Sequence, residues 1–435
     1  MISVVEAARR FRDGTLSPES LTADLLAAIE GANPRLNAYY AVFADDARAA
    51  AATAARELRE GRDRGPFHGI PVGVKDLFDV AGHVTTAGAH PGFRPPPARD
   101  DAEVIVRLRA AGAVLLGKTA LHEWALGVSN NNVHFGPTRN PHDLERIPGG
   151  SSGGSAAALA AGLAVAALGT DTGGSIRIPA ALCGVVGLKP TYGRVSAQGV
   201  TPLSRSLDHP GPMATTVEDA FLMLEAISDL RCAPVGRPRV LLPPRTFFEG
   251  ADPEVERLVR AAVARLGPTD TVELGDVQPV WDANTTILLS DAAAFHEDRV
   301  KQHPDWFGGN MAERLMIGFE YRAVDYARAR DVQREWTERL TRRLGDHAVL
   351  ALPATPVPAT PIGNPEGSAL SKLLTRLTAP FNLAGVPVLA VPVGAIGALP
   401  VGMQLVAAPG RESLLWEVGK AHEAAMQGVA VARAG

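Results

Sequence analysis

The feature that most constrains this chain is a pair of Gly-Gly-Ser steps on either side of one apolar run. Residues 149–155 read Gly-Gly-Ser-Ser-Gly-Gly-Ser, residues 156–168 are apolar and rich in alanine, and residues 169–177 read Gly-Thr-Asp-Thr-Gly-Gly-Ser-Ile-Arg. Glycine lacks the Cβ that would keep backbone amides away from a ligand, so each step can direct N–H groups at an anion. A serine that ends such a step can be a nucleophile whose oxyanion those amides bind. Flexible linkers do not enclose an apolar run of this kind, so the stretch predicts a functional site.

The alternation of apolar segments predicts the fold class. Residues 156–168 are shorter than the roughly 20 residues that span a bilayer, and we interpret them as a buried helix followed by a strand. Helical patterns alternate with apolar strands elsewhere, which predicts an α/β fold with a twisted, mixed and largely parallel sheet covered by helices on both faces. We expect a single large domain over residues 1–435, which consists of N-terminal helices at 3–60, a core with the motifs at 62–230, a divergent substrate-side region at 233–345 and a return to the core at 346–425.

Composition excludes several classes of protein. The 435 residues have a formal net charge of −4, with 46% hydrophobic and 21% charged residues, which is typical of a globular protein and gives no basic surface for nucleic acid. The two cysteines, Cys183 and Cys232, exclude a disulfide framework and favour a reducing compartment. The N-terminus has charges where a signal peptide has its apolar core, so we expect a cytoplasmic protein that does not bind a membrane.

Lysine is rare in this chain, which makes one lysine informative. Six of the 43 basic residues are lysines, and Lys75 lies near the end of a β-like run at residues 68–78. In open α/β sheets, ligands meet the protein at the carboxyl ends of strands. A desolvated lysine can lose its proton, whereas arginine cannot. These observations alone leave Lys75 open between a strand-end surface lysine and a base.

In these segments the sequence resembles the amidase signature hydrolases. The resemblance is carried by residues 149–155, by residues 169–177, by Cys183-Gly184 and by Gly187-Leu188-Lys189-Pro190-Thr191, and it extends more thinly from about residue 3 to 425. It implies the amidase signature fold. It also implies that Ser175 is the nucleophile, that Ser151 is the bridging serine, and that Lys75, in a Gly-Val-Lys-Asp context, completes the triad. In the family a cis non-proline peptide precedes the bridging serine, here Gly150–Ser151.

The implied chemistry is amide hydrolysis through an acyl-enzyme. Neutral Lys75 takes a proton from Ser151, Ser151 takes one from Ser175, and Ser175 attacks the carbonyl carbon. We expect the oxyanion to face the backbone amides of Thr172, Gly173 and Gly174. Burial should lower the pKa of Lys75, and we expect nearby cations such as Arg177 to act in the same direction.

Four further residues are weaker candidates for the site. Residues 125–135 correspond to a family segment that lines the acyl side of the pocket, which suggests substrate contacts for Ala125 and Ser129. Asp171 and Arg177 are expected to give local support, with Arg177 also a weak candidate for contact with a polar substrate. We interpret His134 as a structural histidine, because the triad of the family uses none.

Other interpretations of the same motifs are less well supported. Residues 149–153 match the Gly-x-Ser-x-Gly elbow of α/β-hydrolases, but residues 140–148 predict a loop where that elbow needs a strand. Asp208 and His209 are adjacent on an extended chain and should point in opposite directions, so we do not expect a Ser-His-Asp relay. No phosphate-binding glycine motif and no metal-ligand spacing occurs in the sequence, so we expect neither a metal nor another cofactor.

Two functions are compatible with the sequence. The first is an amidase that converts a small-molecule amide to a carboxylate and ammonia or an amine. The second is the glutamine-hydrolysing catalytic subunit of a glutamyl-tRNA(Gln) amidotransferase, which works only with partner subunits. Residues 135–195 resemble that subunit closely, but residues 288–296 lack the Glu-Ala-Ser-Ser-Asn-Leu pattern of its glutamine site and look more like solitary and biuret- or urea-type amide hydrolases. We therefore favour the amidase. The sequence is compatible with a homodimer. We expect the residues that determine substrate specificity to lie in the 91–135 loops and the 233–345 region.

Overall fold

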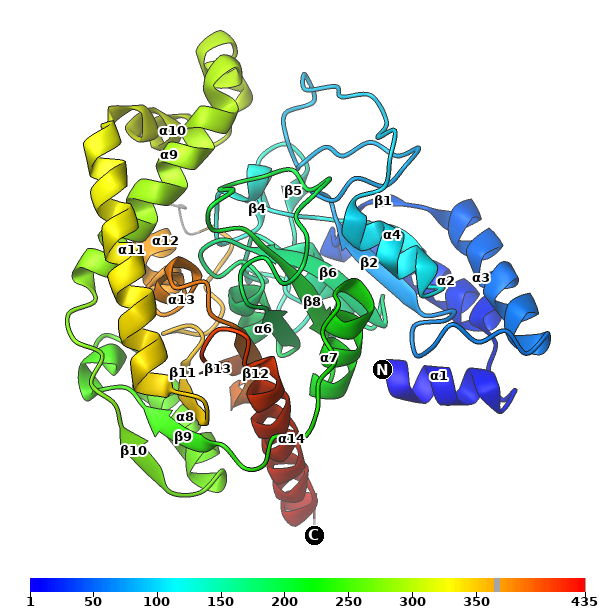
Figure 1. Ribbon diagram of the computed structural model, residues 1–435. Helices are drawn as coiled ribbons and strands as arrows, with labels where there is room; N and C mark the ends of the chain where they lie inside the picture. The colour runs from blue at the N-terminus through cyan, green and yellow to red at the C-terminus, as the bar shows by residue number, and fades with distance from the viewer. Residues whose placement is uncertain (364–367, 435) are drawn as a thin grey trace.

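An eleven-stranded sheet runs through the centre of the molecule in the order β1-β3-β2-β6-β8-β7-β12-β13-β11-β9-β10 (Figure 1). The structure is a computed structural model that describes residues 1–363 and 368–434. The strands of the sheet are β1 (Tyr39–Val42), β2 (Pro71–Lys75), β3 (Val114–Thr119), β6 (Ala166–Asp171), β7 (Val186–Lys189), β8 (His209–Ala214), β9 (Arg239–Leu242), β10 (Thr269–Thr271), β11 (Ala348–Pro353), β12 (Val388–Ile396) and β13 (Leu399–Val406). A separate ladder joins β4 (Asn131–Asn132) to β5 (Gly136–Pro137).

Both kinds of ladder occur in the sheet, which confirms the expected mixed character. Parallel ladders join β3, β2 and β6 at one side and β11, β9 and β10 at the other. Antiparallel ladders join the strands from β6 to β11 across the middle and attach β1 to β3. The antiparallel share is larger than the sequence pattern suggested, in part because β12 and β13 are joined by a turn of two residues, which only an antiparallel pair allows.

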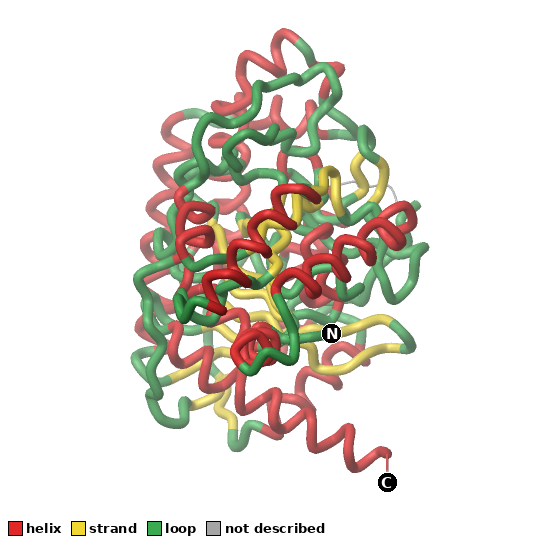
Figure 2. The backbone as a smooth tube through the Cα atoms, turned by 90° about the vertical axis from the view of Figure 1, so that its right-hand side faces the viewer, coloured by secondary structure: helices red, strands yellow, loops and turns green. Residues whose placement is uncertain are grey.

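Helices cover both faces of the sheet, as expected (Figures 1 and 2). On one face, α7 packs against α4 and α14, and α14 packs against α8, whereas α5 and α6 pack together on the other face. The bounds of these helices, on the two faces, are α4 (Glu103–Ala110), α5 (Gly153–Ala160), α6 (Arg177–Cys183), α7 (Val217–Ile227), α8 (Pro253–Arg265) and α14 (Glu412–Ala434). No helix within residues 1–363 and 368–434 is both long enough and apolar enough to cross a bilayer.

The N-terminal segment is less purely helical than the sequence predicts. It contains α1 (Val4–Arg12), α2 (Pro18–Leu36) and α3 (Ala44–Arg59), and the Ser17 side chain caps α2 as its Ser-Pro start indicates. Between α2 and α3 the chain forms β1, the edge strand that pairs with β3. The error arises because a strand of four residues between two long helices is too short to show a period of two.

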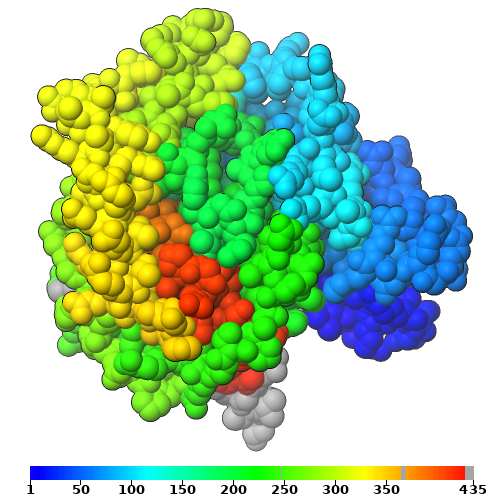
Figure 3. All heavy atoms as spheres, viewed as in Figure 1, coloured from blue at the N-terminus to red at the C-terminus, as the bar shows by residue number. Residues whose placement is uncertain are grey.

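The divergent region adds β9, α8 and β10 to the sheet and its cover, and its later part forms a group of helices along one side of the molecule. It contains α9 (Gln278–Gln302), α10 (Met311–Glu320) and α11 (Ala323–Leu344), and α9 packs against both of the others. Beside α9 lies α13 (Ala379–Leu383), preceded in the chain by α12 (Ser368–Thr375). In the space-filling view, α11 runs along the left side of the molecule, where it is coloured yellow (Figure 3). The short 3₁₀ helices are η1 (Glu123–Ala125), η2 (Arg245–Phe248) and η3 (Pro304–Trp306).

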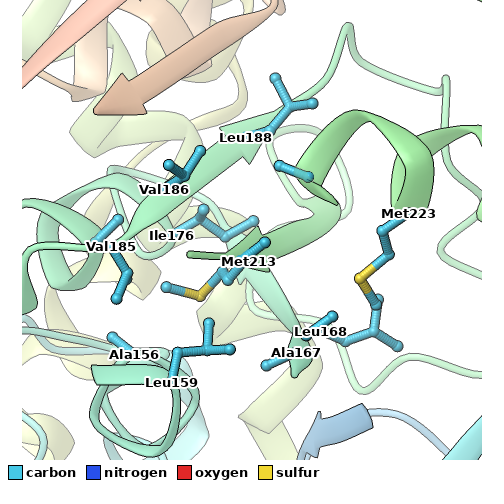
Figure 4. Close-up of a cluster of buried hydrophobic side chains, with 14 of the residues drawn as sticks. Ala156, Leu159, Ala167, Leu168, Ile176, Val185, Val186, Leu188, Met213 and Met223 are labelled. Atoms are coloured by element: carbon cyan, nitrogen blue, oxygen red, sulfur yellow. The ribbon is translucent and has the colours of Figure 1, made fainter. Parts of the chain in front are cut away.

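The apolar run between the Gly-Gly-Ser steps is part of the main hydrophobic core. It forms α5 and then β6, which confirms the predicted helix followed by a strand. Figure 4 shows Leu159 of α5 near Ala167 of β6 and Met213 of β8, with Ile176 in the same cluster, whereas Leu168 lies toward Met223. These side chains are fully buried, so the two serine-bearing turns at the ends of the run are anchored by packing.

Candidate active site

The ends of two adjacent parallel strands bring the candidate residues together. Strand β2 ends at Lys75 and pairs in parallel with β6, which ends at Asp171. The chain then turns through residues 172–175 into α6, while Ser151 and Ser152 lie directly before α5. Helix α5 packs on both β2 and β6. The site therefore lies at the carboxyl ends of the strands, where ligands bind in open α/β sheets.

Lys75 is fully buried among hydroxyl groups. Its Nζ atom lies 2.8 Å from Ser151 Oγ, 2.9 Å from Ser152 Oγ and 2.8 Å from Thr170 Oγ1. Hydroxyls can both donate to and accept from an amine, so this surrounding suits a lysine in either protonation state. The Lys75–Ser151 contact is the first half of the relay that the sequence predicts.

The direction of the predicted pKa change at Lys75 is confirmed, but one of its expected causes is wrong. Burial lowers the pKa of Lys75 to about 7, and the carboxylates of Asp208 and Asp171 oppose this shift. Arg177, whose guanidinium is paired with Asp171 with Nε 2.9 Å from Oδ2, does not add to the lowering. Near neutral pH a large fraction of Lys75 is therefore an uncharged amine.

Arg177 supports the turn and is not among the residues that line the cavity beside Ser175. Its side chain is fully buried, and Nη2 lies 3.0 Å from Asp171 Oδ1. The other guanidinium contacts are donated from Nη1 to Thr378 O and Gln404 Oε1, at 3.1 and 2.8 Å, and from Nη2 to Asn382 Oδ1. Every guanidinium nitrogen thus has an acceptor within the protein. The expectation of local support agrees with this placement, whereas the weaker expectation of a substrate contact does not.

Close packing explains why the serine-bearing turns are rich in glycine. A Cβ atom at Gly154 would collide with the backbone of Ala120, and one at Gly174, where φ is +139°, would collide with the Thr378 side chain. The peptide between Gly150 and Ser151 is cis, as the resemblance implies. The backbone amide of Ser152 donates to the carbonyl of Ser175 over 3.1 Å, which joins the two turns directly.

Ser175 lies at the wall of a cavity of about 420 Å³. Ala125 and Gly173 line the same cavity, whereas Ser129 is buried and its Oγ accepts the amide of Asn131 over 3.1 Å. The remaining walls come from distant segments, and their side chains include Leu126, Val128, Leu203, Asn284, Thr285, Leu288, Leu289, Arg314, Ile317, Tyr321, Ser371, Lys372 and Thr375. The Ala125 expectation therefore agrees with the cavity, and the predicted specificity regions, 91–135 and 233–345, both supply wall residues.

Two histidines that invite a catalytic role have structural surroundings. His134 Nε2 lies 3.2 Å from Glu123 Oε1, and His134 is not among the residues that line the cavity. His209 Nδ1 lies 2.6 Å from the Leu207 carbonyl oxygen, while the neighbouring Asp208 accepts from other groups. These placements agree with the interpretation that neither histidine takes part in a Ser-His-Asp relay.

Sequence reasoning missed Ser152 and Thr170 as neighbours of Lys75. Both lie within the two motifs, one as the second serine of the Ser-Ser pair and the other two residues before Thr172. Their contacts with Lys75 depend on the parallel pairing of β2 with β6, which brings residue 170 beside residue 75. A hydroxyl residue at the end of a strand next to a candidate base is the signal that would have identified them.

Comparisons with known proteins assign the family. The Amidase family model matches residues 20–416. AtzE, the 1-carboxybiuret hydrolase subunit of Pseudomonas sp. (strain ADP), is 36% identical over 96% of this chain and 97% of its own length. A glutamyl-tRNA(Gln) amidotransferase subunit of Chloroflexus aurantiacus (strain ATCC 29366 / DSM 635 / J-10-fl) is 38% identical over 97% of this chain and 96% of its own. A crystal structure described as an amidase superposes with a TM-score of 0.90 at 39% identity, covering 97% of this chain and 99% of that one. The chain therefore belongs to the amidase family and is an amide-hydrolysing enzyme.

Proposed function

We propose that the enzyme hydrolyses the C–N bond of a small amide to a carboxylate and ammonia or an amine, through an acyl-enzyme on Ser175. The observation that carries this proposal is the position of Lys75, whose Nζ lies 2.8 Å from Ser151 Oγ at a buried site that lowers its pKa to about 7. A base with this pKa accepts a proton efficiently near neutral pH. Ser175 faces the cavity where an amide can bind.

The hydrogen bonds of the serine pair favour Ser151 over Ser152 as the bridging residue. Ser152 Oγ donates to the Thr170 carbonyl over 3.2 Å, and it accepts from the Thr170 amide over 3.3 Å. The Ser152 proton is thus engaged with the backbone, so Ser152 can only accept from Lys75. Ser151 is then the member of the pair that can donate its proton to the lone pair of Lys75.

The proposed reaction has two proton-coupled steps. As Ser175 Oγ attacks the amide carbon, its proton moves to Ser151 and the Ser151 proton moves to Lys75. The same relay in reverse protonates the leaving nitrogen, which departs as the C–N bond breaks, and water then hydrolyses the ester on Ser175. The oxyanion is stabilised by the backbone amides of Thr172, Gly173 and Gly174.

Covalent labelling tests this assignment directly. A fluorophosphonate should react with Ser175, because the same relay activates this hydroxyl toward phosphorus, and mass spectrometry should locate the adduct on the peptide that contains residue 175. The purified chain should also release ammonia from members of a panel of simple primary amides. An adduct on Ser151 or Ser152 in place of Ser175 would contradict the proposed nucleophile.

The charge of the cavity predicts a preference among amides. Its described lining includes the cations Arg314 and Lys372 and neither Asp nor Glu. We therefore expect amides with a carboxylate to bind better than cationic ones. Lys372, which is exposed, is the cleaner test of the two, because Arg314 also donates to the Leu126 carbonyl over 2.9 Å.

Lys372→Met should raise the KM of a carboxylate-bearing amide about three- to tenfold, the effect of one partly screened charge, and should leave the KM of a neutral amide unchanged. Steady-state kinetics at low and high salt measure this difference, and salt should reduce it. Lys420→Met is the matched control. It removes the same charge from a lysine that does not line the cavity and lies over the Trp416 ring on α14. A Lys372→Met enzyme with an equal change for neutral and anionic amides would refute the charge preference.

A second candidate function has support from the comparisons. The chain matches a glutamyl-tRNA(Gln) amidotransferase subunit over nearly its whole length. One observation argues against this role. Residues 288–296 of α9 lack the pattern expected of a glutamine site, and two of them, Leu288 and Leu289, line the cavity where the substrate would bind. Hydrolysis of simple amides by the purified chain alone supports the first function. Glutamine hydrolysis that requires partner subunits and tRNA would establish the second.

A further inference from the structure

Asp208 contacts the turn that leads to Ser175. The Thr172 hydroxyl donates to Asp208 Oδ1 over 2.6 Å. The same carboxylate accepts the backbone amide of Leu203 at 2.9 Å from Oδ2, and that of Ser204 at 3.2 Å from Oδ1 and 3.1 Å from Oδ2. Both oxygens of Asp208 are thus used, and they join the turn at residues 172–175 to the segment at residues 203–208.

That segment is joined in turn to a wall of the cavity. Ser204 Oγ and the Ser206 amide both donate to Asp291 Oδ2, at 2.7 and 3.2 Å, and the Tyr326 hydroxyl donates to Oδ1 over 3.1 Å. Asp291 lies on α9, the helix that lines the cavity with Asn284, Thr285, Leu288 and Leu289. A continuous chain of hydrogen bonds therefore runs from the turn beside Ser175 to the helix that lines the cavity.

We propose that Asp208 is a positioning residue for amide hydrolysis, which fixes the Thr172 turn and links it to the α9 wall of the cavity. This inference rests on the proposed function, because it takes the turn as the site of the oxyanion. Arg177 and Asp171 hold the strand side of the turn, and Asp208 holds the Thr172 side chain. Donors that are fixed before the reaction stabilise the transition state most, so a loosened turn should slow acylation more than it weakens substrate binding.

Asp208 also acts on the base through its charge. Burial raises the pKa of Asp208 to about 6, while the Thr172 hydroxyl, the backbone amides and the charge of Lys75 lower it. Its carboxylate favours the charged form of Lys75, so removal of that carboxylate should lower the pKa of Lys75 further. The ionisable side chains near Asp208 are Lys75, Tyr192 and Arg205. Asp291 and Tyr326 are connected to Asp208 through Ser204, and Asp171 acts on the same lysine.

The test is the rate of fluorophosphonate labelling of Ser175 as a function of pH. Asp208→Asn keeps the shape of the side chain but removes the charge and one acceptor oxygen. We expect labelling about 10- to 100-fold slower at pH 8, as for a weakened oxyanion site. At acidic pH the labelling rate falls as Lys75 is protonated, and this part of the profile is its acidic limb. We expect the acidic limb to shift to lower pH by about half a pH unit or more, because Lys75 then stays neutral to lower pH.

Asp219→Asn is the matched control. Asp219 is a buried carboxylate on α7 that accepts the Val5 amide over 3.2 Å, outside the catalytic turn. Its variant should label at the wild-type rate with an unmoved acidic limb, even if its melting temperature falls. A purely structural role for Asp208 would give the same pattern as this control.

The outcomes separate the inference from the function on which it rests. If the wild type labels at Ser175 and Asp208→Asn labels within about twofold of it with an unmoved limb, the inference is wrong and the function stands. If the wild type does not label at Ser175, the proposed function fails and the inference fails with it. Should Asp208→Asn not fold, Thr172→Val removes the hydroxyl donor alone. Labelling of that variant within about twofold of wild type would also overturn the inference.

Discussion

A Lys75→Met enzyme is expected to fold and to acylate Ser175 about 10³-fold more slowly than the wild type, the usual scale for the loss of a general base. Methionine has a similar length and no charge, so it should fit the buried site, at a cost of about 1–3 kcal/mol of stability for the hydroxyls that lose their Lys75 partner. Lys75→Arg should be nearly as inactive, since a guanidinium has no lone pair to offer Ser151. Rapid-quench acylation rates and melting temperatures, measured together for both variants, test this expectation.

The pH dependence of the wild type checks the same assignment. The pKa of Lys75 lies at about 7, so the neutral amine is lost as the pH falls through that value. Acylation should therefore fall about tenfold per pH unit below it and hold at mildly alkaline pH. In Lys75→Met this limb should be absent. A well-folded Lys75→Arg enzyme that acylates within about tenfold of wild type, a barrier change of roughly 1.4 kcal/mol, would remove Lys75 from the mechanism.

Ser175→Ala is expected to lower kcat by about 10⁵-fold or more, to the level that binding alone sustains, because no other group can form the acyl bond. Ser151→Ala should cost less, on the order of 10²- to 10⁴-fold, since water can partly replace a proton shuttle. Single-turnover ammonia release distinguishes the two variants. Equal residual activities, both well above background, would argue against the relay.

Ser155→Ala is the control for changes in the same glycine-rich segment. Ser155 is buried, and its Oγ lies 2.7 Å from Thr119 Oγ1 and donates to the Leu168 carbonyl over 2.9 Å. These are contacts of the core and not of the cavity. The variant should lose about 1–3 kcal/mol of stability through the unpaired polar groups and should keep a kcat close to wild type.

The candidate site residues that lie in local motifs could be proposed from the sequence alone. Lys75, Ser151 and Ser175 lie in compact motifs, and the fold class followed from apolar segments that alternate with helical ones. The buried run before Ser175 was assigned correctly as a helix and a strand, because its length and composition leave few other solutions.

The parts that depend on distant partners were not predictable. Arg177 follows Asp171 closely in the sequence, yet its role is decided by acceptors at residues 378, 382 and 404, from the other end of the chain. Without these partners, Arg177 looked like a free cation that acts on Lys75. Asp208 was considered only with its neighbour His209, whereas its contacts run to Thr172 and onward through Ser204 to α9.

The separation of the cavity walls from the strand ends bears on how such an enzyme can be re-engineered. Lys75 and Thr170 are held by β2 and β6 in the buried sheet, whereas much of the wall comes from α9, α10 and α12 at the side of the molecule (Figure 1). Wall positions such as Thr285, Leu288 and Lys372 can therefore be randomised in a selection library with little disturbance of the proposed catalytic residues. Positions hydrogen-bonded to the segment at residues 203–208, which holds the Thr172 turn through Asp208, form the boundary of that freedom, so Asp291 should be kept fixed even though it lies on a wall helix.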